Sequence, residues 1–358
     1  WIDPGNTAHM ISGNDGGLYE TYDEGENWAF KPNLPVTQFY KVSLGNDKPF
    51  YYIYGGTQDN FSLGGPSQTI NQHGISNSDW FVTNTGDGFE TQVDPIDPNT
   101  IYAQSQYGGL VRLDKESGED IGISPMPSGN EAYRYNWDAP LLISPHDHKT
   151  LYYAANRVFK TTDQGNNWQV ISPDLSQQID RHTLPVMGRI QSVDAIAYDK
   201  STTNYGNITA LEESPVKKGL LYTGTDDGLI QVSEDDGENW HRIKSFSGVP
   251  ANTYVNQITA SQYDENVVFA AFNNHKNGDF KPYLLKSTDK GKSWTSIAGD
   301  LPDRGSVYCV LQDHKKKDLL FAGTEFGVFY TIDGGQKWVQ LKNGLPTVGV
   351  RDMAIHKG

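Results

Sequence analysis

An eight-residue pattern that occurs five times sets the strongest limit on how this chain can fold. The pattern is Ser/Thr-x-Asp-x-Gly-x-x-Trp, and each copy follows an apolar run. The Asp and the hydroxyl side chains accept backbone N–H groups and close a tight turn. The Gly adopts a backbone conformation that a side chain would penalise, and the Trp brings a large apolar surface to the next strand. We interpret the following residues of the pattern as structural and not catalytic: Asp23, Trp28, Asp163, Trp168, Asp235, Trp240, Asp289, Trp294, Asp333 and Trp338.

A second pattern occurs seven times and consists of a short apolar strand, a turn and another short strand. Its copies follow one another at intervals of about 40–50 residues, and four strands per interval are typical of a β-propeller. The step into the fifth copy is longer, and we assign the extra residues to an excursion at 199–218. The small residues at the centre of the seven copies are Gly13, Gly55, Ala103, Ala154, Gly224, Ala271 and Gly323.

An innermost strand is expected before each copy except the first, which begins too early in the sequence to have one. In the fifth unit we expect this strand at 192–196, and residues 350–355 form an inner strand with no unit after it. We therefore predict an all-β, seven-bladed β-propeller with four-stranded antiparallel blades, closed by the C-terminal strand so that no sheet edge is left exposed. The single domain is 1–358, with blades at about 1–36 plus 349–356, 37–85, 86–127, 128–176, 186–246, 250–301 and 302–343.

Composition narrows the class of partner. The 37 Gly, 20 Tyr, 14 Phe and 8 Trp residues suit many short strands joined by turns. The formal net charge of −15 argues against nucleic acid as a partner, because phosphate binding needs basic patches. No apolar run approaches the ~18–20 residues that cross a bilayer, so we expect no transmembrane segment. Cys309 is the only cysteine, and no internal disulfide can form.

Several further stretches carry a family resemblance. They are 1–4 with 13–17, 38–40, 58–60, 142–147, 213–215 with 224–228, and 350–356. Together with the five turns they resemble the BNR, or Asp-box, repeat β-propellers, and in particular a bacterial family described as sortilin (VPS10)-like or glycosyl-hydrolase-type BNR repeat proteins. The resemblance implies a secreted, periplasmic or outer-membrane-associated protein. It also implies a fragment of a longer protein in which a second propeller domain is a partner of this one.

The candidate functional face is the one opposite the repeated turns. In a four-stranded blade, the turn after the second strand and the connection into the next blade lie together on that face. Loop 128–138 is its densest part, where aromatic side chains beside carboxylates suit sugar stacking or a peptide groove. The alternative for Tyr135 and Trp137 is packing between blades. The candidate ligand-binding residues are Asp15, Asp59, Asn60, Asp87, Glu90, Arg134, Tyr135, Trp137, Asp226, Asp227, Glu325 and Arg351.

Three functions follow from this face. We favour a non-catalytic binding propeller that grips a glycan or a protein segment at its central funnel. The first alternative is a xyloglucanase-like glycoside hydrolase, which needs two carboxylates about 5–9 Å apart and works with a second propeller. The second alternative is a structural scaffold in an assembly. No catalytic residue and no metal site are identified, and no cofactor is expected, with Ca²⁺ as an alternative at turns 14–17 and 226–228.

Overall fold

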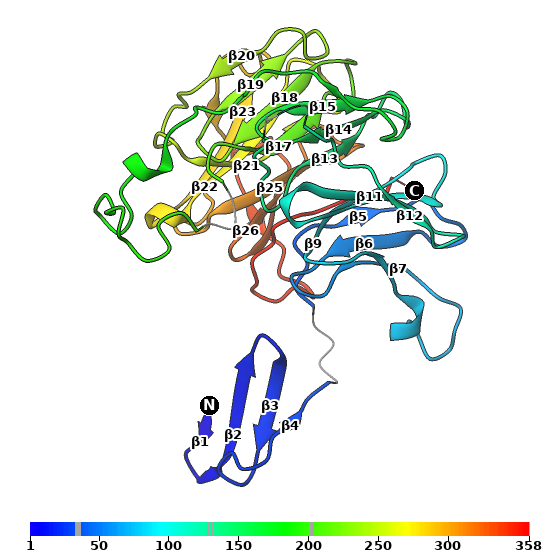
Figure 1. Ribbon diagram of the computed structural model, residues 1–358, viewed down its shortest axis with the longest axis vertical. Coiled ribbons are helices and arrows are strands. Elements are labelled where there is room, and N and C mark those ends of the chain that lie inside the picture. Colours follow the sequence, from blue (N-terminus) through cyan, green and yellow to red (C-terminus); the bar gives the residue numbers. More distant parts are fainter. Residues whose placement is uncertain (33–36, 128, 130–131, 201–203, 358) are drawn as a thin grey trace. The chain divides into compact units, whose positions relative to one another are not determined.

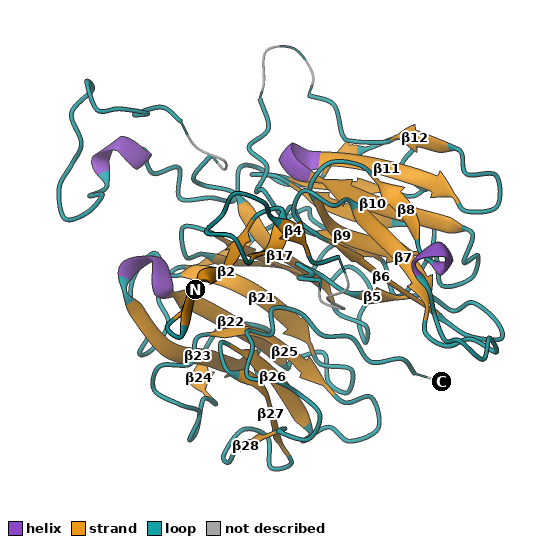
Figure 2. Ribbon diagram, turned by 90° about the horizontal axis from the view of Figure 1, so that it is seen from below, coloured by secondary structure: helices purple, strands orange, loops and turns teal. Residues whose placement is uncertain are grey.

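The computed structural model describes residues 1–32, 37–127, 129, 132–200 and 204–357. The chain forms two compact units, Trp1–Gln38 and Phe39–Gly358, called unit 1 and unit 2 below. Within the described residues, seven four-stranded antiparallel sheets hold β1 to β28, in chain order inside each sheet (Figures 1 and 2). No described helix is long and apolar enough to span a membrane. These features confirm the predicted all-β class of seven four-stranded blades.

Unit 1 holds one of the sheets and unit 2 holds six. The four strands of unit 1 are β1 (Ile2–Asp3), β2 (Asn6–Asn14), β3 (Gly17–Thr21) and β4 (Ala29–Phe30). The first three sheets of unit 2 are β5 (Ser43–Leu44), β6 (Tyr52–Gly56), β7 (Ser62–Pro66), β8 (Phe81–Asn84); β9 (Gly88–Val93), β10 (Thr100–Ser105), β11 (Gly109–Asp114), β12 (Asp120–Gly122); β13 (Leu141–Ile143), β14 (Leu151–Ala154), β15 (Val158–Thr161), β16 (Gln169–Val170).

The remaining three sheets of unit 2 repeat the same arrangement. They are β17 (Ile208–Glu213), β18 (Leu221–Thr225), β19 (Ile230–Ser233), β20 (His241–Ile243); β21 (Tyr254–Ala260), β22 (Val268–Asn274), β23 (Asp279–Ser287), β24 (Thr295–Ser296); β25 (Val307–Gln312), β26 (Leu320–Thr324), β27 (Gly327–Thr331), β28 (Val339–Gln340). Four single-turn 3₁₀ helices interrupt the loops: η1 (Asn77–Asp79), η2 (Gln106–Gly108), η3 (Arg181–Thr183) and η4 (His275–Asn277).

The five repeated turns share one hydrogen-bond scheme. In the turn after β19, Ser233 Oγ donates to Asp235 Oδ1 at 2.8 Å and accepts the Gly237 N–H at 2.8 Å. Asp235 Oδ1 also accepts the Asn239 N–H at 2.9 Å. Asp236 and Gly237 have φ of 62° and 95°, and this pair of positive φ values recurs in all five turns. Because each Asp is occupied in closing its own turn, the geometry supports a structural role for these residues.

Three of the repeated Trp residues, Trp168, Trp240 and Trp338, join neighbouring sheets. The indole Nε1 of Trp168 donates to the Ile123 carbonyl at 2.6 Å, and that of Trp338 donates to the Ile297 carbonyl at 2.9 Å. Each acceptor directly follows the last strand of the preceding sheet. A buried indole N–H needs an acceptor, so each of these bonds fixes one sheet against the next.

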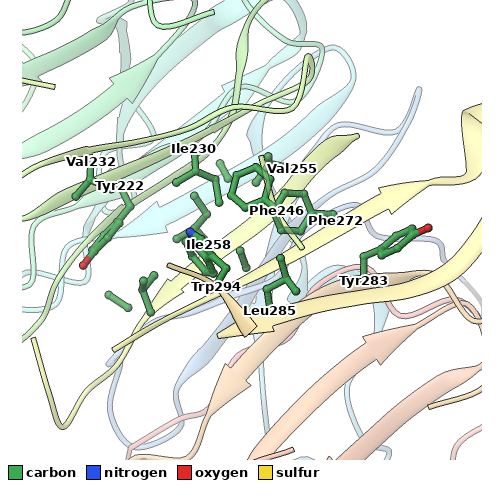
Figure 3. Packing of buried hydrophobic residues seen from close by; sticks show 14 of the residues in the cluster. Tyr222, Ile230, Val232, Phe246, Val255, Ile258, Phe272, Tyr283, Leu285 and Trp294 are labelled. Carbon is green, nitrogen blue, oxygen red and sulfur yellow. The ribbon is translucent and has the colours of Figure 1, made fainter. Parts of the chain in front are cut away.

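The largest core cluster lies between sheets β17–β20 and β21–β24 (Figure 3). Phe246, in the connection between the two sheets, has its ring centroid 4.9 Å from that of Phe272 and 6.0 Å from that of Trp294. Tyr222 and Ile230 complete one side of the cluster and are fully buried. Burying one such side chain contributes about 1.5–3 kcal/mol, so packing between sheets, rather than within them, holds unit 2 together.

The expected inner strand of the fifth unit at 192–196 is wrong. The strand that pairs with β18 is β17, with Ile208 opposite Thr225. The expected excursion at 199–218 is therefore also misplaced, and the insertion precedes β17. Val193 and Ile196 are 75% and 100% exposed, whereas Ile208 is fully buried. Both stretches alternate apolar and polar residues, but only the second is covered by neighbouring sheets.

The first unit has an inner strand after all. β1 pairs with β2, with Ile2 opposite Met10, and the Ile11 N–H donates to the Trp1 carbonyl at 2.9 Å. The prediction that this sheet lacks its own strand is therefore wrong, because two residues are enough to form it. No strand is formed at 350–355. The Val350 N–H donates to the Thr324 carbonyl at 2.9 Å, and closure of a ring by this segment stays a prediction.

Candidate functional site

A polar cavity of about 200 Å³ lies among the inner strands of unit 2. Its walls come from β9, β13, β17 and β21, together with the segments before β5 and after β28. The inner strands bring charged residues into this cavity from elements that are far apart in the sequence. One lysine and four carboxylates line it: Lys41, Glu90, Asp138, Glu212 and Asp352.

Lys41 is the only cation of the cavity lining and faces several of the carboxylates. Its Nζ lies 3.6 Å from Asp138 Oδ2. Burial by itself lowers the pKa of Lys41, but the charges of Asp138, Asp352 and Glu90 outweigh it and raise that pKa. Lys41 therefore stays protonated and holds the carboxylates of three separate segments together.

The cavity carboxyls resist ionisation. Burial raises the pKa of Glu90 to about 8, and the neighbouring Asp352 and Asp138 carboxylates add to the rise. Burial likewise raises the pKa of Glu212 to about 8 and raises the pKa of Asp138. Asp352 is anchored, because its Oδ2 accepts the Val42 N–H at 3.0 Å. Burial of several acids around one lysine thus favours their protonated forms.

A cluster of aromatic and polar side chains stands beside the cavity. We call it the rim cluster, and it consists of Tyr40, Gln58, Asp59, Asp87, Tyr107 and Trp137. Two of its residues are the sequence neighbours of cavity residues, since Tyr40 precedes Lys41 and Trp137 precedes Asp138. The Tyr40 hydroxyl donates to Gln58 Oε1. Burial raises the pKa of Tyr40, and the nearby Asp87 and Asp138 carboxylates raise it further. The rim cluster and the cavity are therefore neighbours along the chain at two places.

The rim cluster is held in place by its own loops. The Asp59 N–H donates to Asp87 Oδ1 at 2.7 Å, and the Asp87 N–H donates to Gln106 Oε1 at 2.8 Å. Trp137 meets Tyr107 edge to face, with ring centroids 4.8 Å apart. Tyr107 is 61% exposed, in a left-handed conformation with φ of 63°. The two hydrogen bonds thus link three loops of the rim cluster, and one of these loops carries the exposed Tyr107 ring.

Two of the predicted ligand-binding residues, Arg134 and Tyr135, make contacts within the protein. Arg134 Nη2 donates to Asp174 Oδ2 at 2.7 Å and to the Gly206 carbonyl at 3.0 Å. Tyr135 packs against Tyr153 with ring centroids 5.5 Å apart. These contacts match the alternative of packing between blades for Tyr135 and give Arg134 a bridging position between loops.

The adjacent carboxylates of the β18–β19 turn are also engaged. Asp226 Oδ1 accepts the Asn207 N–H at 2.9 Å, and Asp227 Oδ2 accepts the Gln177 N–H at 2.6 Å. Burial raises the pKa of Asp226 to about 7 and raises the pKa of Asp227. Asp226 is 8% exposed, and Asp227 is fully buried. Their carboxylates therefore anchor the loops on either side of the long insertion.

Glu325 and Arg351 surround a tyrosine that the sequence analysis did not single out. The Tyr308 hydroxyl donates to Glu325 Oε2, and the Arg351 guanidinium lies 4.5 Å from the centre of the Tyr308 ring. A tyrosine beside a carboxylate is the arrangement of a sialidase nucleophile. Tyr308, however, is only 2% exposed, and burial raises its pKa to about 12. The pair is therefore a structural hydrogen bond.

The remaining predicted positions lie apart from the rim cluster or outside the described residues. Asp15 is in the β2–β3 turn of unit 1. Asn60 is exposed, and its Nδ2 donates to the Gln58 carbonyl at 3.1 Å. In loop 128–138, residues 128, 130 and 131 are outside the described part of the chain. Among the residues that are described, no set of three His, Cys, Asp or Glu side chains is arranged to hold a metal ion.

Of the five charged cavity residues, only Glu90 was among the candidate ligand-binding residues. Lys41, Asp138, Glu212 and Asp352 were not, although Asp138 ends the predicted loop 128–138. A signal was present, because Glu90 and Gln92 occupy alternate positions of β9, and such alternation places both on one face of a strand. A charged residue on that face of an inner strand points into the cavity, and that rule indicates Lys41 but not Glu212, which lies outside the inner strand expected at 192–196.

Comparisons with known proteins give modest similarities. No family model matches the sequence. Over 221 residues the chain is 22% identical to the oligoxyloglucan-reducing end-specific xyloglucanase of Emericella nidulans, which covers 61% of this chain and 25% of the relative. Over 224 residues it is 24% identical to a Neosartorya fischeri protein named as a probable oligoxyloglucan-reducing end-specific xyloglucanase, with the same coverage. The chain thus spans 25% of the length of these curated relatives.

Solved structures resemble the chain over most of its length. The extracellular domain of a one-component system from B. thetaiotaomicron covers 92% of this chain and 37% of that chain, with a TM-score of 0.54 and 13% identity. The computationally designed protein Ika8 covers 98% of this chain and 88% of that chain, with a TM-score of 0.51 and 12% identity. At such low identity these likenesses concern the fold alone. The seven four-stranded sheets and the similarity to xyloglucanases together support a β-propeller.

Proposed function

We propose that this chain is a non-catalytic, glycan-binding propeller of a secreted or cell-envelope protein, of the BNR (Asp-box) type. The glycan lies on the rim cluster, above the polar cavity. One observation carries the proposal: Tyr107 is 61% exposed and meets Trp137, and its neighbour Gln106 bonds to Asp87, which in turn bonds to Asp59. An exposed aromatic face stacks on the C–H face of a sugar ring, and adjacent carboxylates accept hydrogen bonds from its hydroxyl groups.

The charge of the protein limits the class of glycan that it can bind. The net charge is −15, and the rim cluster as defined above has two carboxylates, Asp59 and Asp87, and no cation. Such a surface repels polysaccharides that carry uronate or sulfate groups. Neutral glycans are therefore the expected ligands. The other expected ligand is an extended protein segment that places polar side chains over the Tyr107 ring.

The similarity to xyloglucanases supports a glycan as ligand and provides the main alternative. The chain matches 25% of each relative, which fits a fragment of a longer protein with a second propeller as partner. In the alternative, this fragment supplies one side of a glycoside hydrolase cleft, with Asp59, Asp87 or Glu90 as an acid or base. In a second alternative the propeller is a scaffold, and the rim cluster is covered by another chain.

The test is a panel of neutral and acidic polysaccharides, measured with the 358-residue chain by calorimetry and by release of reducing ends. We expect binding to a neutral polysaccharide without release. Trp137→Ala should weaken this binding about tenfold, since an aromatic contact contributes about 1–1.5 kcal/mol. Tyr263→Ala is the matched control. Tyr263 is 40% exposed and follows the C-terminal end of β21, away from the rim cluster.

Three outcomes contradict the proposal. Release of reducing ends that is lost in Asp87→Asn would establish the hydrolase alternative in its place. Absence of binding to any polysaccharide by a correctly folded chain would favour the scaffold alternative. A Tyr263→Ala variant that loses as much affinity as Trp137→Ala would show that the glycan does not bind at the rim cluster.

A further inference from the structure

A groove of about 670 Å³ runs along the outer strand β16 in unit 2. It lies between the repeated turn of sheet β13–β16 and that of sheet β17–β20, on the face opposite the rim cluster. We call it the β16 groove. None of the candidate ligand-binding residues named above lies in it. Its walls are turn 161–168, segment 169–173 and turn residues 235–238.

The lining of the β16 groove mixes polar and apolar residues and includes a strand edge. Trp168, Val170 and Ile171 form its apolar part, called the apolar floor below, and Val170 is 44% exposed. β16 pairs with β15 on one side and is the last strand of its sheet. On the other side it has no partner strand in the described part of the chain. A free antiparallel edge beside an apolar floor is where an extended peptide adds a strand.

The rim of the β16 groove is acidic. Asp163, Asp235, Asp236 and Glu238 stand against a single lysine, Lys160, which pairs with Asp236. Hydrogen bonds from Asn167 and Thr161 hold the pKa of Asp163 at about 2, so it is ionised at neutral pH. Glu238 is exposed and makes no side-chain hydrogen bond to the residues described. The groove therefore offers uncompensated negative charge beside an apolar floor.

The equivalent groove one sheet further along differs in charge. It has about 410 Å³ and the corresponding Trp240 in its lining, but Lys290 and Lys292 stand opposite Glu234 and Asp235. Lys290 Nζ lies 2.8 Å from Glu234 Oε2. The two grooves share fold, turn and tryptophan, so the chain contains its own comparison for the effect of charge.

We propose that the β16 groove binds an extended protein segment in which lysine or arginine alternates with apolar residues. The segment adds to β16 as an outer strand. Because side chains alternate along a strand, its apolar residues face Trp168 and Val170, and its cations face Asp235 and Glu238. This site is independent of the rim cluster and takes a different class of ligand.

The probe is a short synthetic peptide that alternates lysine and valine, with capped ends, titrated into the full chain and followed by tryptophan fluorescence. A peptide of the same length that alternates lysine and glycine has the same charge and no apolar face. We expect the first peptide to bind more tightly. Glu238→Lys and Val170→Lys should each weaken it about fivefold or more, the size expected for reversing or adding one surface charge at a contact.

Lys292→Glu is the matched control, because Lys292 is exposed in the neighbouring groove and its reversal should leave the affinity within about twofold. Equal binding of the two peptides would overturn the proposal, since it would reduce the effect to the net charge of the protein. Absence of binding, or an equal effect of Glu238→Lys and Lys292→Glu, would overturn it as well. Polysaccharide binding should be unchanged in Glu238→Lys, which separates this test from that of the rim cluster.

Discussion

The repeated turns and the loops at the opposite ends of the strands belong to the same sheets but differ in their hydrogen-bond partners. In each repeated turn one hydroxyl and one carboxylate bond to the turn itself, as Thr161 and Asp163 do. The opposite loops bond to one another, as Asp59 does to Asp87 across two sheets. The turns are therefore uniform because they are self-contained, whereas the loops differ because each fits its neighbours. Stability should depend on the first region and ligand binding on the second.

Gly237→Ala should have the largest effect on stability. Gly237 has φ of 95°, and an added Cβ would lie 2.7 Å from the Ile171 carbonyl oxygen of the preceding sheet. Strain and backbone clash together should lower the free energy of unfolding by about 3 kcal/mol, measured by denaturant titration. Gly248→Ala is the control, because Gly248 has φ of 80° and open space around it, and it should cost only about 1 kcal/mol.

Ser233→Ala should have the next largest effect. Ser233 is fully buried, and its hydroxyl satisfies the buried Gly237 N–H at 2.8 Å. Loss of this acceptor should lower the free energy of unfolding by about 2 kcal/mol, the cost of an unsatisfied buried donor. Ser233→Thr keeps the hydroxyl, as in Thr161 and Thr331 of other copies, and should stay within about 0.5 kcal/mol of the parent. A loss as large as that of alanine would show that the hydroxyl is not the reason for the effect.

The same contrast explains what could be predicted from the sequence. The repeated turns were identified because their residues interact over eight positions, so the sequence contains the whole unit. The rim cluster and cavity join residues 40–41, 87–90 and 137–138 with Asp352, and only the arrangement of the sheets within unit 2 brings them together. Glu90 was predicted as a site residue, but its neighbour Lys41 was not, because nothing local to Lys41 shows which carboxylates it will face.

The misplaced fifth inner strand has a related cause. Residues 192–196 and 208–213 both alternate apolar and polar side chains, and this alternation predicts a strand in either place. Ile208 is buried by contact with sheets that are distant in the sequence, while Ile196 is fully exposed. Local pattern therefore could not choose between the two stretches. Arg134 and Asp226 show the same limit of local pattern, because a loop that bonds to its neighbour has the same polar composition as one that binds a ligand.

Acids of the two regions should respond to pH in opposite directions. In the turns the pKa of Asp163 is lowered to about 2, so its contribution to stability is lost as the pH falls. In the cavity the pKa of Glu90 is raised from 4.5 to about 8. Its folded state binds more protons than the unfolded state, so stability present below pH 4.5 is lost as the pH rises through 8. Glu90→Gln should reduce the loss of stability between pH 4.5 and pH 8 by about 1–2 kcal/mol.

The measurement is the free energy of unfolding from denaturant titration at several pH values between 4.5 and 9. Glu119→Gln is the control, because Glu119 is exposed in the β11–β12 turn and its substitution should leave the pH profile unchanged. A Glu90→Gln profile that is parallel to that of the parent would contradict the assignment of the pH dependence to the cavity.

Tyr107→Ala should change stability least and therefore tests the contrast most directly. Tyr107 is 61% exposed and contacts Trp137 only edge to face, so the free energy of unfolding should change by less than about 1 kcal/mol. If the loops serve binding, the same substitution should raise the dissociation constant for a neutral polysaccharide about tenfold, because the stacking face is lost. Ser233→Ala should do the reverse, with reduced stability and unchanged affinity at a temperature where the chain stays folded. A Tyr107→Ala variant with full affinity would place the ligand away from the rim cluster, and the distinction between stabilising turns and binding loops would no longer hold.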